Sequence, residues 1–151
     1  VEVQALVCRT NFNMPRRTSA GTDYNRVNLL MAVIEKRIGL HLGDCDAYIN
    51  VAGGMRINEP ALDMGIVLAV LSSYKNIAID SKTICFGEVG LVGEVRAVNQ
   101  AEQRVIEAAK LGFDRCIMPK VNCDSLNIDR EQLKGMKLVG VKSIYELLEV
   151  I

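Results

Sequence analysis

The chain has 151 residues, half of them hydrophobic, which is the size of one domain that buries a sizeable core. Its 18 Lys and Arg residues equal its 18 Asp and Glu residues, which excludes a global field that attracts nucleic acid or an anionic membrane. Any charged partner must therefore contact a local patch of the surface.

Cysteine and histidine usage excludes two further classes. Five cysteines without a CxxC pair argue against a closed disulfide framework and favour a reducing cytoplasm. With one histidine, His41, we expect no zinc site. Cys8, Cys85 and Cys116 lie in apolar stretches and are expected in the core. No apolar run is long enough to span a bilayer, so no membrane association is expected.

The first part of the chain predicts a strand, a loop and a helix. Apolar residues alternate over 1–7, as in a strand, and a polar loop is expected over 9–23. Apolar residues at helical spacing predict a helix over 24–40, with Asp23 as its N-cap and Gly39 as its end. Because the chain opens on a strand without an initiator methionine, we expect it to be a fragment of a longer protein.

The next segment raises the question of function. Residues 46–54 predict a strand that ends in paired glycines, and "NEPALDMG" then opens an apolar helix. Asn58 is the expected cap, and Pro60 occupies the first helical position, where its missing N–H costs nothing. Asp63 then lies in the first turn, where a carboxylate gains about 0.3–1 kcal/mol from the helix dipole.

The remaining chain predicts a hairpin, two strands and two helices. Two GEV triplets among β-branched residues are typical of a tight hairpin, and they are not a phosphate loop because no GK run precedes a Ser or Thr. The expected elements are the hairpin within 83–98, a helix over 99–113, strands over 115–119 and 137–141, and a helix over 143–151 capped by Ser143. This order predicts a single α+β, or α/β-like, domain over residues 1–151, with a mixed sheet and helices packed against it.

Several arginines gather near the predicted first loop. Arg9, Arg16 and Arg17 precede the first acidic residue of this segment, Asp23, and Arg26 follows at the helix start. Such a patch can neutralise a few phosphates and give weak, salt-sensitive binding. The residues alone favour the alternative, which is a solvated loop.

The residue types allow two catalytic arrangements to be considered for this chain. The lone His41 gives little support to a Ser-His-Asp triad. A Ser-Lys pair is open, with Ser72 or Ser73 beside Lys75 as candidates. These residues lie near the far end of the predicted helix, away from its start.

Two long segments carry a family resemblance. "INVAGGMRINEPALDMGIVLAVLSS" and "GEVGLVGEVRAVNQAEQRVIEAAKLGFDRCIMPK" resemble the proteolytic domain of Lon proteases over roughly residues 45–120. "VEVQALV", "PRR", "YNRVNLLMAVIEKR", "NVAGG", "EPALDMG" and "GEVGLVGEVR" more closely resemble the C-terminal Lon-like domain of the RadA (Sms) family of bacterial DNA-repair proteins. The resemblance implies the fold of the Lon proteolytic domain, with its glycine-rich hairpin.

The resemblance also places two residues at positions of peptidase chemistry. The position of the Lon nucleophilic serine falls on Asp63, and that of the Lon lysine falls on Arg104. Asp63 has no hydroxyl to acylate, and an arginine stays protonated and cannot serve as the general base. We therefore expect no enzyme activity in this domain. We expect Asp63 and Arg104 to meet in a bidentate structural clasp that holds the former dyad site together.

The family resemblance further implies a role in an assembly. Such proteins resemble ring-forming, DNA-dependent ATPases whose zinc-binding N-terminus and RecA-like motor are expected outside this chain. ATP, magnesium and zinc are therefore expected in those domains, and no cofactor is expected here. The Lon-like domain is expected to help build a hexameric ring and to contact DNA in recombination and branch migration, with Arg16, Arg17 and Arg26 facing DNA or an interface. The alternative is an active, ATP-dependent Ser-Lys peptidase domain of the Lon type.

Overall fold

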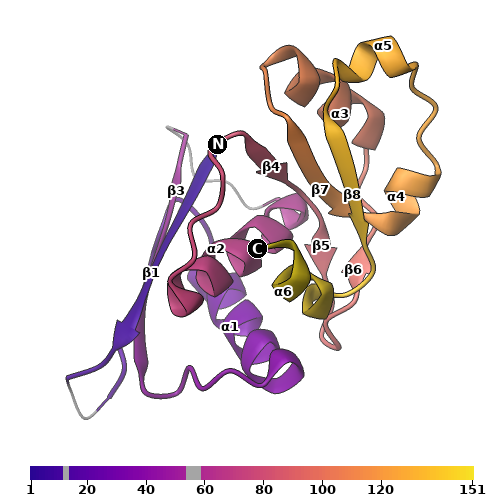
Figure 1. The fold of residues 1–151 in the computed structure, drawn as a ribbon. Coiled ribbons are helices and arrows are strands. Elements are labelled where there is room, and N and C mark those ends of the chain that lie inside the picture. Colours follow the sequence, from indigo (N-terminus) through magenta and orange to yellow (C-terminus); the bar gives the residue numbers. More distant parts are fainter. Residues whose placement is uncertain (12–13, 54–58) are drawn as a thin grey trace.

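The computed structural model describes residues 1–11, 14–53 and 59–151, whose arrangement is shown in Figure 1. The strands are β1 (Glu2–Arg9), β2 (Arg17–Ala20), β3 (Cys45–Ala52), β4 (Thr83–Cys85), β5 (Glu88–Val89), β6 (Val95–Arg96), β7 (Arg115–Pro119) and β8 (Lys137–Val141). The helices are α1 (Tyr24–Ile38), α2 (Asp63–Lys75), α3 (Ala101–Lys110), α4 (Lys120–Asp124), α5 (Arg130–Leu133) and α6 (Leu147–Val150), with 3-10 turns η1 (Pro60–Leu62) and η2 (Ile144–Glu146). The predicted α+β class is confirmed.

The first sheet has the strand order β1-β3-β2, with β1 antiparallel and β2 parallel to β3. Val3, Ala5 and Val7 of β1 pack against the core, so the predicted first strand is confirmed. The expectation of a loop throughout 9–23 is wrong, because residues 17–20 form β2. This edge strand consists of four residues without an apolar alternation, and it owes its extended form to pairing with β3.

The second sheet is parallel and has the order β4-β7-β8. Its strands alternate between two apolar clusters: Cys85, Ile117 and Val139 face the cluster of α1 and α2, whereas Cys116 and Met118 face that of α3. Figure 1 shows α1 and α2 between the two sheets, and α3, α4 and α5 on the outer face of the second sheet. The predicted mixed sheet is confirmed in β1-β3-β2, while the strands of the second half form a separate parallel sheet. The reason is that α2, buried on most of its sides, separates two smaller sheets and packs between them.

The glycine-rich segment forms the predicted hairpin, although a shorter one. β5 and β6 pair antiparallel, with Val89 opposite Val95. Gly93 has a φ of 82°, the left-handed conformation that a turn of this kind requires. Residues 83–85, which were expected within the hairpin, instead form β4 and pair with β7.

The predicted caps at Asp23, Gly39 and Ser143 are confirmed, whereas the helix expected over 99–113 is shorter, Ala101–Lys110. The Asp23 carboxylate accepts the N–H of Asn25 at 3.0 Å before α1, and α1 ends at Gly39, whose φ is 86°. Ser143 accepts the N–H of Tyr145 at 3.1 Å, although the turn that follows is a 3-10 turn. α4 and α5 were not predicted, because elements of five and four residues are too short to show a helical period. Across the described ranges, no helix has the length and apolar content needed to cross a bilayer.

Candidate functional site

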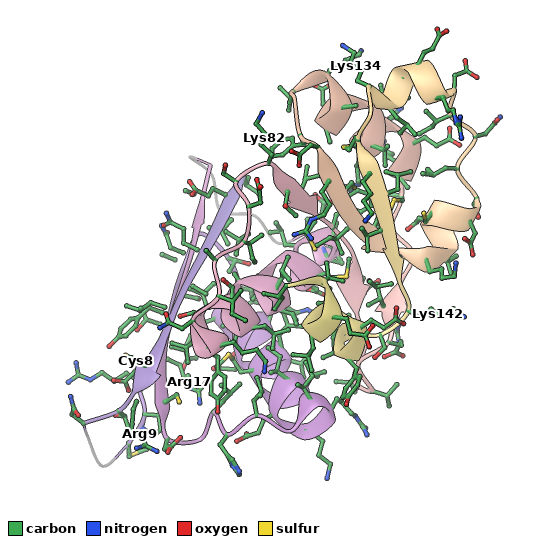
Figure 2. All side chains as sticks on the ribbon, in the orientation of Figure 1. Cys8, Arg9, Arg17, Lys82, Lys134 and Lys142 are labelled. Atoms are coloured by element: carbon green, nitrogen blue, oxygen red, sulfur yellow. The ribbon has the colours of Figure 1, made fainter. Side chains whose placement is uncertain are left out.

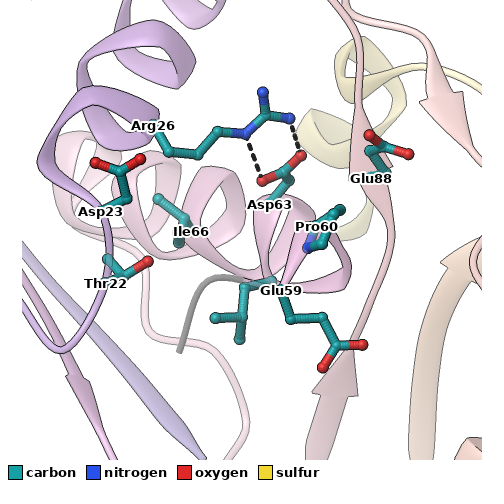
Figure 3. Close-up of a pocket in the computed structure, with 9 residues that line it drawn as sticks. Thr22, Asp23, Arg26, Glu59, Pro60, Asp63, Ile66 and Glu88 are labelled. Carbon is teal, nitrogen blue, oxygen red and sulfur yellow. Dashed lines mark hydrogen bonds and ion pairs between the residues drawn. The ribbon is translucent and has the colours of Figure 1, made fainter. Parts of the chain in front are cut away.

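A pocket of about 200 Å³ lies where the start of α2 meets α1 and the base of the hairpin (Figure 3). It contains the position at which a Lon-type nucleophile was expected. Its lining residues are Thr22, Asp23, Arg26, Glu59, Pro60, Leu62, Asp63, Ile66 and Glu88.

Local sequence determines how the chain enters this pocket. Glu59 is extended, Pro60 opens the 3-10 turn η1, and Asp63 begins α2 directly after it. The N–H of Met64 donates to the carbonyl of Gly87 at 3.0 Å, which joins the helix start to the segment before β5. The expected cap Asn58 lies outside the described residues. Pro60 at the first position of the turn is confirmed.

Asp63 is buried, and both of its carboxylate oxygens have partners. Arg26 of α1 donates Nε–H to Oδ1 at 2.9 Å, and its Nη2 contacts Oδ2, so the pair is bidentate. The backbone N–H of Val89 donates to Oδ2 at 3.0 Å, and Arg26 Nη2 donates to the Val89 carbonyl at 3.0 Å. The hydrogen bond with Asp63 raises the pKa of Arg26 above its ordinary value, although burial by itself would lower it. The group joins α1, α2 and β5.

The predicted clasp between Asp63 and Arg104 is wrong. Arg104 of α3 binds the Glu59 carboxylate and donates Nε–H to the carbonyl of Asn99 at 3.0 Å. Its guanidinium also lies 5.9 Å from the centre of the Phe86 ring. The physical reason is direction: Glu59 lies before the 3-10 turn on the side that meets α3, whereas Asp63 is buried toward α1.

The three arginines expected to face DNA or an interface have different environments. Arg16 is exposed, and its backbone N–H donates to the carboxylate of Asp46 at 2.7 Å. Arg17 is half-buried and donates Nη2–H to the carbonyl of Leu42, which follows α1. Arg26 binds Asp63 in the pocket. A role of these residues toward DNA stays a prediction.

The rival Ser-Lys arrangement receives no support from its geometry. The Ser72 hydroxyl donates to the carbonyl of Ile77, and the Ser73 hydroxyl accepts the N–H of Val7 at 2.8 Å. Both serines lie in the last turns of α2, at the opposite end from the pocket. Their hydroxyls therefore close the helix end and hold it to β1.

The five thiols are free, but they differ in exposure. Cys116 is buried as expected, and burial raises its pKa to about 12. Burial also raises the pKa of Cys85. Cys8, expected in the core, is exposed because it points to the outer face of β1. Among the described residues, no three His, Cys, Asp or Glu side chains are grouped so that they could bind a metal.

Comparison with known proteins identifies a protein family that matches this chain. The family model described as subunit ChlI of Mg-chelatase matches residues 21–122 of this chain. The chain belongs to this family. The matched residues run from the turn before α1 to α4 and include Arg26, Asp63 and the whole hairpin.

Curated relatives match nearly the whole chain. The DNA repair protein RadA of Halalkalibacterium halodurans is 47% identical over 99% of this chain and 32% of its own length. The proteins of the same name from Bacillus subtilis and Streptococcus pneumoniae are 49% and 45% identical, over 98% of this chain and 31% and 34% of their own lengths. The chain thus spans about a third of the length of these relatives. The predicted similarity to RadA is confirmed, whereas the Lon-like assignment stays a prediction.

The partner of Asp63 is the site residue that sequence reasoning missed. Arg26 was assigned to the basic patch, and it lies 37 positions before Asp63 in the chain. One signal was present: a carboxylate at the start of an almost wholly apolar helix needs a cation or N–H donors when it is buried. That signal indicates that a partner exists but does not say which arginine supplies it.

Proposed function

We propose that this chain is the non-proteolytic, Lon-like domain of a RadA-type DNA repair protein, and that it helps to assemble a ring and contacts DNA during recombination and branch migration. The observation that carries the proposal is the identity of 47% and 49% over at least 98% of the chain to proteins named DNA repair protein RadA. The ATP, magnesium and zinc of the whole protein belong to domains outside this chain. The protein works in the cytoplasm as a hexamer.

The geometry around Asp63 supports the absence of peptidase activity. A carboxylate stands where the acyl-accepting hydroxyl would be needed, and Arg26 and Val89 engage both of its oxygens. This carboxylate positions the hairpin relative to α1 and α2. In this proposal the pocket is the place where α1, α2 and β5 are joined, and it corresponds in position to a catalytic site without its catalytic residues.

A peptidase assay separates this proposal from the Ser-Lys alternative. The chain is incubated with unfolded casein and with a serine-reactive probe, beside the variants Ser72→Ala and Ser73→Ala. We expect neither cleavage nor labelling in any of them. Turnover or labelling that is lost in one serine variant would establish the alternative, an active Lon-type peptidase.

The DNA contact is proposed to involve Arg16 and Arg17 and, at the pocket, Arg26. A salt-titrated binding curve to labelled DNA tests the first two residues. The double variant Arg16→Gln, Arg17→Gln should weaken binding and flatten the slope of log K against log salt by about two, since two phosphate contacts are lost. The matched control is Lys82→Gln, Lys134→Gln, which changes two exposed cations at the distant end of the molecule (Figure 2). Equal curves for both double variants would remove this patch from the proposal.

Ring assembly is tested separately by sedimentation. A hexamer of the full-length protein that dissociates when this domain is deleted would support the proposed assembly role. A ring that persists unchanged without the domain would contradict it.

A further inference from the structure

The turn between β5 and β6 presents two large apolar side chains to solvent. Leu91 is 64% exposed and Val92 is 60% exposed. The turn projects from the body of the protein beside the C-terminal end of α1 (Figure 1). Two adjacent exposed apolar residues on a projecting turn form a potential contact surface, unlike a single exposed leucine.

This tip is held in place on both sides. Within the turn, the N–H of Gly90 donates to the carbonyl of Glu94, and that of Gly93 to the carbonyl of Gly90, both at 3.0 Å. Outside it, Arg37 Nε–H donates to the Leu91 carbonyl at 3.4 Å. The N–H of Ile144 donates to the Gly93 carbonyl at 2.9 Å.

The base of the hairpin is fixed as well, because Asp63 and Arg26 bind the backbone of Val89. The apolar tip is therefore presented by an ordered hairpin and not by a loose loop. A contact made by such a pre-organised element loses little conformational entropy on binding.

Cations surround the tip. The last turn of α1 carries Lys36 and Arg37, and the neighbouring exposed cations on β6 and after β8 are Arg96 and Lys142 (Lys142 is labelled in Figure 2). Three carboxylates are near: Glu88, Glu94 and Glu146. Glu94 accepts the N–H of Val92, Glu146 accepts the N–H of Lys142, and Glu88 lines the pocket at the base of the hairpin. Arg96 Nη2 donates to the Glu94 carboxylate at 3.3 Å, so these two charges compensate each other. Lys36, Arg37 and Lys142 then outnumber Glu88 and Glu146, and this small excess of positive charge at the rim favours an anionic partner.

The cationic rim continues toward the arginines of the first sheet. Arg17 donates to the carbonyl of Leu42 in the connection that follows α1, and Arg37 in the last turn of α1 donates to Leu91. The C-terminal end of α1 therefore lies between the Arg16 and Arg17 pair and the tip. A backbone that runs along this edge could contact both.

We propose that Leu91 and Val92 form an apolar wedge that inserts between bases of DNA, while Arg37 and Lys142 contact the neighbouring phosphates. Apolar wedges flanked by cations are a known means of unstacking a base step, and leucine is among the residues that proteins use for this purpose. This inference rests on the proposed DNA contact and deepens it, because it names the element that touches bases.

The test uses this chain and a short DNA duplex containing a fluorescent adenine analogue that brightens when it unstacks. Wild type should bind and raise the analogue's emission. The double variant Leu91→Ser, Val92→Ser should bind about tenfold more weakly and leave the emission unchanged, with the same salt slope because the cations remain. The matched control is Leu111→Ser, Val121→Ser, two residues of similar exposure away from the tip, which should behave as wild type.

A second variant keeps the result interpretable if the double variant fails to fold. Lys142→Gln retains the wedge and removes one exposed cation whose side chain does not hold the tip, so it should flatten the salt slope by about one and keep the rise in emission. Circular dichroism confirms folding of each variant.

Each remaining outcome decides against a specific claim. If wild type binds without a rise in emission, or if the Leu91→Ser, Val92→Ser variant behaves as wild type, the wedge is overturned and the DNA contact stands. If wild type does not bind the duplex, both the wedge and the DNA contact of this domain are overturned. A tip variant that changes sedimentation but not emission assigns the tip to a protein contact and overturns the wedge.

Discussion

Two carboxylate–arginine pairs lie at one pocket, and they differ mainly in the burial of the carboxylate. Asp63 and Arg26 have side chains that are 2% and 31% exposed, whereas those of Glu59 and Arg104 are 44% and 25% exposed. The Asp63 carboxylate also accepts a backbone N–H from β5. The two carboxylates are only four positions apart in the chain, and yet their ion pairs have different structural roles.

The difference teaches which pair holds the fold. Removing one partner of a buried pair leaves a charge without compensation and costs about 3–5 kcal/mol, whereas an exposed pair contributes about 0–1 kcal/mol. Asp63 therefore determines where the hairpin lies relative to α1 and α2. The ion pair of Glu59 with Arg104 links the residue before η1 to α3 at the surface and contributes little to stability.

The largest expected effect is that of Arg26→Ala, after which the Val89 N–H, at 3.0 Å, is the donor left to the buried Asp63 carboxylate among the described residues. We expect the free energy of unfolding to fall by about 3 kcal/mol, the lower end of the range, because Arg26 is itself partly exposed. Urea unfolding followed by circular dichroism measures the change. A loss below about 1 kcal/mol would show that burial does not separate the two pairs.

An intermediate effect on the free energy of unfolding is expected for the buried thiol of Cys116, which tests the effect of burial on a group other than a carboxylate. Burial raises the pKa of Cys116 from 9.0 to about 12, so the folded protein keeps a proton that the unfolded chain loses above pH 9. The contribution of this thiol to the free energy of unfolding is complete below pH 9 and is lost as the pH rises toward 12. Between these pH values the free energy of unfolding should fall with a slope that approaches about 1.4 kcal/mol per pH unit for one thiol.

Two cysteine variants isolate this contribution from that of the other alkaline groups. Unfolding free energies of wild type, Cys116→Ala and Cys8→Ala are measured at several pH values from 8 upward. The slope should be shallower in Cys116→Ala and unchanged in Cys8→Ala, because Cys8 is exposed. Parallel slopes in all three proteins would contradict the burial argument.

The smallest effect is expected for Glu59→Ala. Its carboxylate is 44% exposed, and Arg104 keeps its hydrogen bonds to Asn99 after the change. We expect a loss of less than about 1 kcal/mol, which high salt should reduce further because exposed pairs are screened. Unfolding curves at low and high salt check this. A salt-independent loss as large as that of Arg26→Ala would place Glu59 among the residues that hold the fold.

Local sequence was sufficient for the elements whose cause is local. The α1 helix begins and ends where the Asp23 cap and Gly39 predict, since a cap acts on the helix beside it. The hairpin followed from its glycines and β-branched residues. The position of Asp63 at the start of a helix was likewise readable, because Pro60 opens the turn before it.

The tertiary structure decided what depends on segments far apart in the chain. The polar strand β2 exists because β3 offers it a parallel edge, and the sheet is divided because α2 is buried between two sets of strands. The partner of Asp63 is Arg26 and not Arg104, because the path of α1 brings a guanidinium to the buried carboxylate. Sequence shows that a buried charge needs a partner, but only the packing of the helices selects which cation reaches it.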